Sequence, residues 1–211
     1  MKVELLTSPL SFERMEHIAA VAALTCHGNA DKEFSAPDVL GRIIKSGHES
    51  VLEHINLTYS IKGLSRACLQ EMARHRHISL SVESTRHTLK KNIAKGSYIQ
   101  QALSNIKDPS YQYRARKAIE ELLSFFRINP EILSDELKYF LPEFWPTNLV
   151  LTSNIRELRH ILKLRTAPAA LQEFRNLARA MYEAVPEAFK YLLRDCVHEE
   201  QPQVQCEAEE V

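Results

Sequence analysis

The stretch RHRHISLSVESTRH, from Arg74 to His87, holds three arginines, three histidines and three serines in a chain of 211 residues with a formal net charge of zero. Apolar residues at helical spacing predict a helix over 63–76, and alternating apolar and polar residues predict an extended segment over 78–83. Guanidinium groups bind phosphate through paired hydrogen bonds, and hydroxyl groups can complete such a site. The stretch therefore indicates an anion site, with a solvated basic helix end that forms surface ion pairs as the alternative.

The composition is that of an ordinary globular protein, with 45% hydrophobic and 26% charged residues. We expect one domain over residues 1–197 and an acidic, disordered tail over 198–211, which carries five glutamates and no lysine or arginine. The equal numbers of basic and acidic residues, 27 each, argue against a nucleic-acid partner. No apolar run approaches the roughly 20 residues that cross a bilayer, and the first residues lack the apolar core of a signal peptide. We therefore expect no membrane partner and a cytoplasmic location.

A second polar stretch, GHESVLEH from Gly47 to His54, contains two histidines and two glutamates. A helical zinc site of the HExxH type needs histidines at i and i+4, on one face of the helix. His48 and His54 are six residues apart, about 600° around a helix, and so lie on opposed faces. The four cysteines form no CxxC pair, and no glycine-rich dinucleotide motif is present. We expect no metal, and a helix N-terminus with Glu49 near the positive end of the dipole is the simplest explanation of this stretch.

Hydrophobic periodicity and turn residues predict strands and helices in mixed order. Three strands are expected, over 2–6, 55–62 and 147–152, besides the extended segment over 78–83. Helices are expected from a Ser11 cap to Cys26, through 39–46 with Gly47 at the end, from Asp108, from Asn129, over 154–165 and 168–185, and from Pro186 to Cys196. Residues 89–106 are weakly periodic and are expected to form helix or loop.

The segment Asn154 to Arg165 predicts a helix with Leu158, Ile161 and Leu162 as its apolar stripe. Asn154 and Arg165 are eleven residues apart, roughly 20° out of phase, and so bracket this stripe at its two ends. A polar group that faces a core needs a partner. The alternative is that each residue lies at an exposed helix end.

Three blocks of this sequence resemble the flavin-dependent thymidylate synthases. Arg74, His75 and Arg76, then seven residues and Ser84, match the RHRx7S signature of that family, and GHESVLEH matches its GHxSxxEH-like segment. A third block matches an LPxxxxT pattern followed by NxRxLxHxxxLR, through Leu141, Pro142, Thr147, Asn154, Arg156, Leu158, His160, Leu164 and Arg165. The blocks occur in order over most of the chain.

The resemblance implies an α+β fold with a central, mostly antiparallel sheet flanked by helices, in a single catalytic domain. It implies an FAD-dependent methyltransferase that converts dUMP to dTMP, with methylenetetrahydrofolate as carbon donor and NADPH as the reductant of the flavin. It also implies a homotetramer whose active sites are shared between subunits.

The resemblance also implies roles for individual residues. The catalytic group comprises His48, Ser84 and Arg165. FAD would be held by Ser50, Glu53, Arg74, His75, Arg76, Asn154, Arg156 and His160. The nucleotide would be held by Gln70, Glu71, Arg74, Ser84, Thr85, Arg86, Lys138 and Arg165, with Ser84, Thr85 and Arg86 from one subunit and Gln70, Glu71 and Arg74 from another.

Ser84 is expected to bind the substrate through hydrogen bonds. A serine becomes a nucleophile only when a positioned base takes its proton, and the sequence fixes no such base, although His75 or His87 could lie close. Cys26 and Cys68 stand in apolar helical surroundings, where a thiol is inert.

Five positions depart from the family pattern: Glu71, Ser81, His87, Lys138 and Leu171. Lys138 replaces an arginine that binds phosphate, so it offers a point charge in place of a two-pronged contact. These departures leave open a degenerate relative that binds flavin without making thymidylate. A module that binds a phosphate backbone is the remaining alternative, although the isoelectric point near 7.1 and the lack of aromatic residues in the Arg74–His87 window disfavour it.

Overall fold

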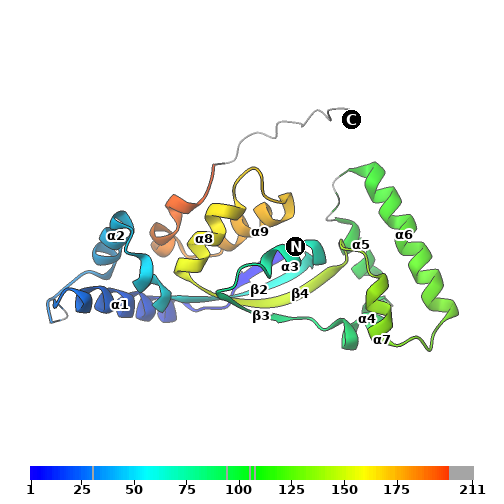
Figure 1. Ribbon diagram of the computed structural model, residues 1–211, viewed down its shortest axis with the longest axis horizontal. Helices are drawn as coiled ribbons and strands as arrows, with labels where there is room; N and C mark the ends of the chain where they lie inside the picture. The colour runs from blue at the N-terminus through cyan, green and yellow to red at the C-terminus, as the bar shows by residue number, and fades with distance from the viewer. Residues whose placement is uncertain (30, 94, 105, 107, 200–211) are drawn as a thin grey trace.

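The computed structural model describes residues 1–29, 31–93, 95–104, 106 and 108–199. Its centre is a sheet of four strands, β1 (Lys2–Leu5), β2 (Asn56–Ser65), β3 (Ile78–Val82) and β4 (Pro146–Asn154), in the order β1-β2-β4-β3. All three neighbouring pairs are antiparallel. Helices cover one face of the sheet and extend beyond it at both ends (Figure 1). The expected α+β class with a flanked antiparallel sheet is confirmed.

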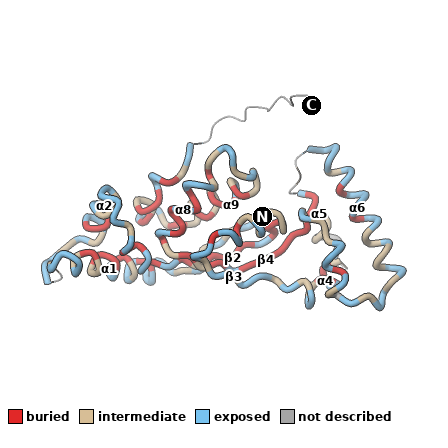
Figure 2. Tube along the Cα trace, in the orientation of Figure 1, coloured by how far each residue is buried: buried red, intermediate tan, exposed pale blue. Residues whose placement is uncertain are grey.

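Alternation along β2 decides which face of the sheet is buried. Leu57, Tyr59 and Ile61 are fully buried, whereas the residues between them are exposed or half-buried. Thr58 pairs with Thr152 of β4, and their hydroxyl oxygens lie 2.9 Å apart on the polar face. Burial runs along β2, β4 and the helices above them (Figure 2). Each buried aliphatic side chain of this kind contributes roughly 1.5–3 kcal/mol to folding.

The helix predicted over 63–76 is shorter than expected, because β2 continues to Ser65. The pairing of β2 with β4 shifts register between Lys62 and Leu64, and Gly63 adopts a φ of 76° at this point. Its amide donates to Oδ1 of Asn148 at 3.0 Å. Helix α3 then spans only Arg66–Met72, capped by the Ser65 hydroxyl, which accepts from the amide of Cys68. The RHR triplet therefore lies in the turn after this helix.

The N-terminal helices meet the predictions apart from one cap. Helix α1 spans Pro9–Cys26 and is capped by Ser8, whereas Ser11 was expected. Pro9 occupies the first turn, where its missing N–H costs nothing, so the helix begins before Ser11. Helix α2 spans Ala36–Ser46 and ends at Gly47, whose φ of 72° is the expected left-handed conformation. Residues Glu49–His54 form the 3-10 helix η1.

A helical region at the other end of the molecule follows β3. It comprises α4 (Thr85–Ile93), α5 (Gly96–Ser104), α6 (Pro109–Ile128), α7 (Ser134–Leu137) and the 3-10 helix η2 (Lys138–Phe140) (Figure 1). The expected helix start at Asp108 is confirmed, and the Asp108 carboxylate caps α6 by accepting from the amide of Ser110 at 2.7 Å. The helix expected from Asn129 is wrong. Asn129 closes α6 instead, because its side-chain amide and its backbone amide both donate to the carbonyl of Phe125.

The C-terminal helices complete the core. Helix α8 spans Ile155–Arg165, and α9 spans Gln172–Glu183, which is shorter than the predicted 168–185. The 3-10 helices η3 (Glu187–Leu192) and η4 (Arg194–Cys196) follow. The expected disordered tail falls outside the described residues from position 200 on, whereas His198 is tied to α8 through the Thr166 hydroxyl and the Lys163 carbonyl. None of the described helices is long and apolar enough to cross a membrane.

Candidate active site

His75 is the buried centre of the site. Its Nδ1 lies 3.1 Å from Oε1 of Glu157, and its Nε2 lies 3.0 Å from Nε of Arg165. An arginine Nε can only donate, so Nε2 of His75 accepts and Nδ1 carries the proton. Burial lowers the pKa of the His75 imidazole, and the charge of Arg165 lowers it further, against the opposing effect of Glu157. The ring is therefore a neutral imidazole of fixed tautomer.

The guanidinium of Arg165 is held on three sides. Its Nε donates to His75, and its Nη1 donates to Oε2 of Glu71 at 2.8 Å. The guanidinium carbon lies 4.7 Å above the ring of Phe174, within the range of a cation–π contact. The second carboxylate oxygen of Glu71 lies 3.6 Å from Nη1 of Arg74. The fold thus fixes this guanidinium in one orientation, and its side chain remains 15% exposed.

An open groove of about 370 Å³ begins at these residues. Its lining combines basic and imidazole groups with small apolar side chains, namely Arg74, His75, His160, Leu164, Arg165, Ala169 and Ala170. Cationic donors suit phosphate oxygens. The donor set therefore fits a ligand that carries phosphate groups, as FAD does.

Ligand atoms of His75, Glu157 and His160 lie within 4.8 Å of one another, a spacing that could hold a metal ion. Neither the His48/His54 spacing nor the cysteine pattern pointed to this group. Both ring nitrogens of His75 already form hydrogen bonds, so a cation here would have to replace the one from Arg165 or the one to Glu157. We assign no metal to this group.

The segment His48–His54 borders α8 through η1. His48 and Ser50 are exposed. Glu53 accepts from Nη1 of Arg156 at 2.5 Å. Asn154 caps α8, and its Oδ1 accepts from the amide of Glu157 at 2.8 Å. The Asn154 side chain therefore caps the helix and does not face the apolar stripe, whereas Arg165 at the other end has the hydrogen-bond partners that a polar group beside the core needs.

A second group of polar side chains lies on the helical region after β3. The two guanidinium nitrogens Nε and Nη2 of Arg86 donate to the two oxygens of Asp135, at 2.9 and 2.6 Å. This ion pair holds the pKa of the Asp135 carboxyl below its usual range. Ser84 and Lys138 are exposed, and Thr85 begins α4. The group presents hydroxyls and cations to solvent.

Comparison with known proteins decides the family. Residues 10–189 match the family described as thymidylate synthase complementing protein. A flavin-dependent thymidylate synthase of Campylobacter jejuni is 41% identical over 83% of this chain and 85% of its own, and one of Wolinella succinogenes is 37% identical over 87% and 94%. The chain belongs to the flavin-dependent thymidylate synthase family. A crystal structure of thymidylate synthase X from Helicobacter pylori with FAD and dUMP is similar at a TM-score of 0.81 and 30% identity, covering 94% of this chain and 100% of that one.

Not all the synthase residues expected from the sequence come together within one chain. Arg74, His75, His160 and Arg165 line the groove, and Glu71 contacts it through Arg165. Gln70, one residue earlier, donates to both carboxylate oxygens of Glu143. The second group, formed by Ser84, Thr85, Arg86 and Lys138, is called the Arg86 group. No hydrogen bond or ion pair among the described residues joins it to the groove. Figure 1 shows α4 and α7 at the end of the molecule, away from α8.

The residues that orient the synthase groups were not predicted from the sequence. Glu157 fixes the tautomer of His75, and Phe174 supports Arg165. Glu83 precedes Ser84 and accepts from Asn92, Tyr98 and Asn148. Although burial alone would raise the pKa of the Glu83 carboxyl, these hydrogen bonds lower it, so the end of β3 is anchored by a carboxylate. A signal for Glu157 was present, since it stands three residues before His160 on one helix face.

The expectations for serine and cysteine have different outcomes. Among the described residues no imidazole forms a hydrogen bond with the hydroxyl of the exposed Ser84, and its role in binding the substrate stays a prediction. Cys68 is buried, and burial raises the pKa of its thiol, so it is inert as expected. Cys26 is exposed, which corrects the expectation that it is surrounded by apolar residues. It occupies the last position of α1, where the helix leaves the core.

Proposed function

We propose that this chain converts dUMP to dTMP by reductive methylation, with FAD bound in the groove and methylenetetrahydrofolate and NADPH as co-substrates. The observation that carries the proposal is the Arg165 guanidinium, held by His75, Glu71 and Phe174 at the mouth of a groove lined with further basic groups. When bound, FAD supplies hydride transfer. The chain's own residues would bind FAD and dUMP and orient them relative to each other.

The flavin would be held by residues around the groove and on η1. Arg74 and Arg76 are exposed guanidiniums suited to the diphosphate, and His160 lies on the groove wall. His48 and Ser50 offer a ring nitrogen and a hydroxyl from η1. Glu53 would act through Arg156, and Asn154 would act by fixing the start of α8.

Arg165 would hold the pyrimidine of dUMP. Nε of this guanidinium donates to His75, Nη1 donates to the Glu71 carboxylate and Nη2 donates to the Glu71 carbonyl at 3.4 Å, so its two remaining N–H groups point in fixed directions and little orientational freedom is lost on binding. The neutral His75 is part of this arrangement, because a protonated ring could not accept from Arg165. Glu71, a departure from the family pattern, is thus used as the partner of Arg165.

The phosphate of dUMP would be bound by Ser84, Thr85, Arg86 and Lys138. These residues lie apart from Arg165 within one chain, which supports a homotetramer in which each active site takes the Arg86 group from one subunit and Gln70, Glu71, Arg74 and Arg165 from another. The tetramer, the single catalytic domain over 1–197 and the cytoplasmic location remain predictions. The main hydrophobic cluster joins buried residues of 12–72 with buried residues of 149–196, which supports one domain built on the sheet, while the helical region after β3 packs around two smaller clusters of its own.

The decisive experiment is the visible absorption spectrum of the purified chain before and after addition of dUMP, followed by a thymidylate assay. We expect a flavin spectrum that shifts with dUMP, and dTMP formation that needs NADPH and methylenetetrahydrofolate. A flavin spectrum and dUMP shift without dTMP would favour the degenerate relative. A colourless chain that takes up no added FAD would contradict the proposal.

A further inference from the structure

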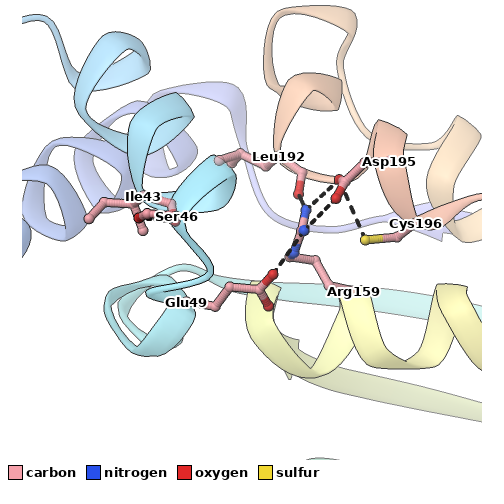
Figure 3. A network of polar contacts seen from close by, with 7 residues as sticks. All are labelled: Ile43, Ser46, Glu49, Arg159, Leu192, Asp195 and Cys196. Atoms are coloured by element: carbon pink, nitrogen blue, oxygen red, sulfur yellow. Dashed lines mark hydrogen bonds and ion pairs between the residues drawn. The ribbon is translucent and has the colours of Figure 1, made fainter.

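Arg159 lies near the middle of α8 and is 1% exposed, although it carries a charge. Figure 3 shows its guanidinium between η1 and the C-terminal turns. Nη1 donates to the carbonyl of Leu192 at 2.5 Å and to Oδ1 of Asp195 at 2.7 Å, and Nη2 donates to Oδ2 of Asp195 at 2.7 Å and to Oε1 of Glu49 at 2.9 Å. A single side chain therefore joins three segments that are far apart in the sequence.

Arg159 needs these contacts because a buried charge without hydrogen-bonded partners is strongly destabilising. Burial alone would lower the pKa of the guanidinium, but the hydrogen bonds with Asp195 and Glu49 raise it above its usual value. Removing one carboxylate leaves a buried charge that is only half compensated, which is strongly destabilising. The segments that carry Glu49 and Asp195 are thus held in place by the same group.

Glu49 lies between two residues of the proposed flavin site. Its side chain points inward to Arg159, while the flanking His48 and Ser50 are exposed. Glu49 is the first residue of η1, so a tie on its side chain fixes the backbone between His48, which directly precedes it, and Ser50, which directly follows it. The second tie between η1 and α8, from Glu53 to Arg156, is half exposed and so contributes little. Val51 and Leu52 anchor the middle of η1 in the core, and the contact between Glu49 and Arg159 is the buried polar tie at its start, beside His48 and Ser50.

We infer that Arg159 is a positioning residue of the flavin site, which holds η1 through Glu49 so that His48 and Ser50 face the cofactor. The inference rests on the proposed function, because it needs FAD to contact η1. Asp195 lies on the opposite side of the guanidinium and has no contact with η1 among the residues of Figure 3. Glu49 and Asp195 therefore share one stabilising role, but only Glu49 transmits position to the flavin site.

The test compares Glu49→Gln with Asp195→Asn in the full chain. Each variant removes one of the two carboxylates of the same buried arginine, so both are expected to lower the melting temperature. FAD affinity, measured by quenching of flavin fluorescence, should fall about tenfold in Glu49→Gln and stay within about twofold of wild type in Asp195→Asn. Glu49→Asp, which keeps the charge but shortens the side chain, serves if Glu49→Gln does not fold, and it should weaken FAD binding with a smaller loss of stability.

The outcomes separate the inference from the proposed function. Equal losses of FAD affinity in Glu49→Gln and Asp195→Asn would mean that only stability is affected and would overturn the inference. Unchanged affinity in Glu49→Gln or Glu49→Asp would overturn it as well. If the wild-type chain itself binds no FAD, the proposed function fails, and the inference fails with it.

Discussion

The two basic groups of this protein differ in how the fold treats them. The Arg165 side chain is 15% exposed and is fixed by a histidine, a carboxylate and an aromatic ring. The Arg86 side chain is 65% exposed and pairs with one carboxylate, that of Asp135. The first guanidinium is oriented before any ligand arrives, whereas the second is held by an exposed partner that a phosphate could replace. The groove therefore holds a guanidinium of fixed orientation, whereas Arg86 in the helical region has a partner that a ligand could replace.

The largest effect should follow from Arg165→Lys. A lysine keeps the charge but cannot donate to His75 and Glu71 in fixed directions, so kcat/KM for dUMP should fall about 100-fold. Steady-state kinetics of the purified variant would measure this. Arg194→Lys makes the same chemical change at an exposed ion pair with Glu187 and should leave kcat/KM unchanged. Similar kinetics for Arg165→Lys and wild type would remove the basis of the comparison.

A pH dependence should come next, because His75 is held neutral. Its pKa is lowered in the folded chain, so below pH 6.5 the unfolded chain binds a proton that the folded chain does not. The free energy of unfolding should therefore fall as the pH drops below 6.5, by at most about 1.4 kcal/mol per pH unit from this residue. Urea unfolding between about pH 5.5 and 7 should show a smaller slope in His75→Gln than in wild type. Equal slopes would contradict a neutral His75.

Asp135→Asn should have a smaller effect, and in the opposite direction. It removes the carboxylate that competes with phosphate for Arg86, so the KM for dUMP should decrease about threefold with little change in kcat. The difference should shrink at high salt, because the groups are exposed. An increase in KM would show that Asp135 orients Arg86 for the substrate and that the exposed pair is also preorganised.

The smallest effect is expected from Glu120→Gln. This substitution breaks the exposed pair with Lys117 on α6, which lies outside both groups. Thermal unfolding should place the variant within about 0.5 kcal/mol of wild type, with unchanged kinetics. A larger loss of stability would show that exposed ion pairs of this chain contribute substantially to folding. The exposed Arg86 pair could then no longer be treated as weakly held in comparison with Arg165.

The sequence predicted an element correctly where its signal is local, that is, where adjacent residues are enough to determine it. The alternation along β2, the helix start at Asp108 and the left-handed Gly47 are signals of this kind. The prediction of a helix from Asn129 failed because an asparagine can cap the end of one helix as well as the start of the next. Here its side chain binds the carbonyl of Phe125 and caps the end of α6.

The site was only half predictable for a related reason. The resemblance pointed to the groove residues, but their partners are distant in sequence. Glu157 is 82 residues from His75, and Glu49 is 110 residues from Arg159. Nothing in a single sequence pairs such positions, because the pairing depends on how α8 is laid against the turn after α3 and against η1. These two carboxylates differ from the other glutamates of the chain by their buried position in the fold, which a single sequence does not show.

The strand order has a consequence for how the chain is made. β4 lies between β2 and β3, yet it is the last strand in the sequence. A nascent chain that has not yet reached Asn154 can pair β1 with β2, but β3 has no neighbour to join. Pairings over such long sequence separations form slowly and leave apolar surface exposed in the meantime. The strand that directly follows the RHR triplet therefore stays unpaired until β4, some 70 residues further along the chain, has been synthesised.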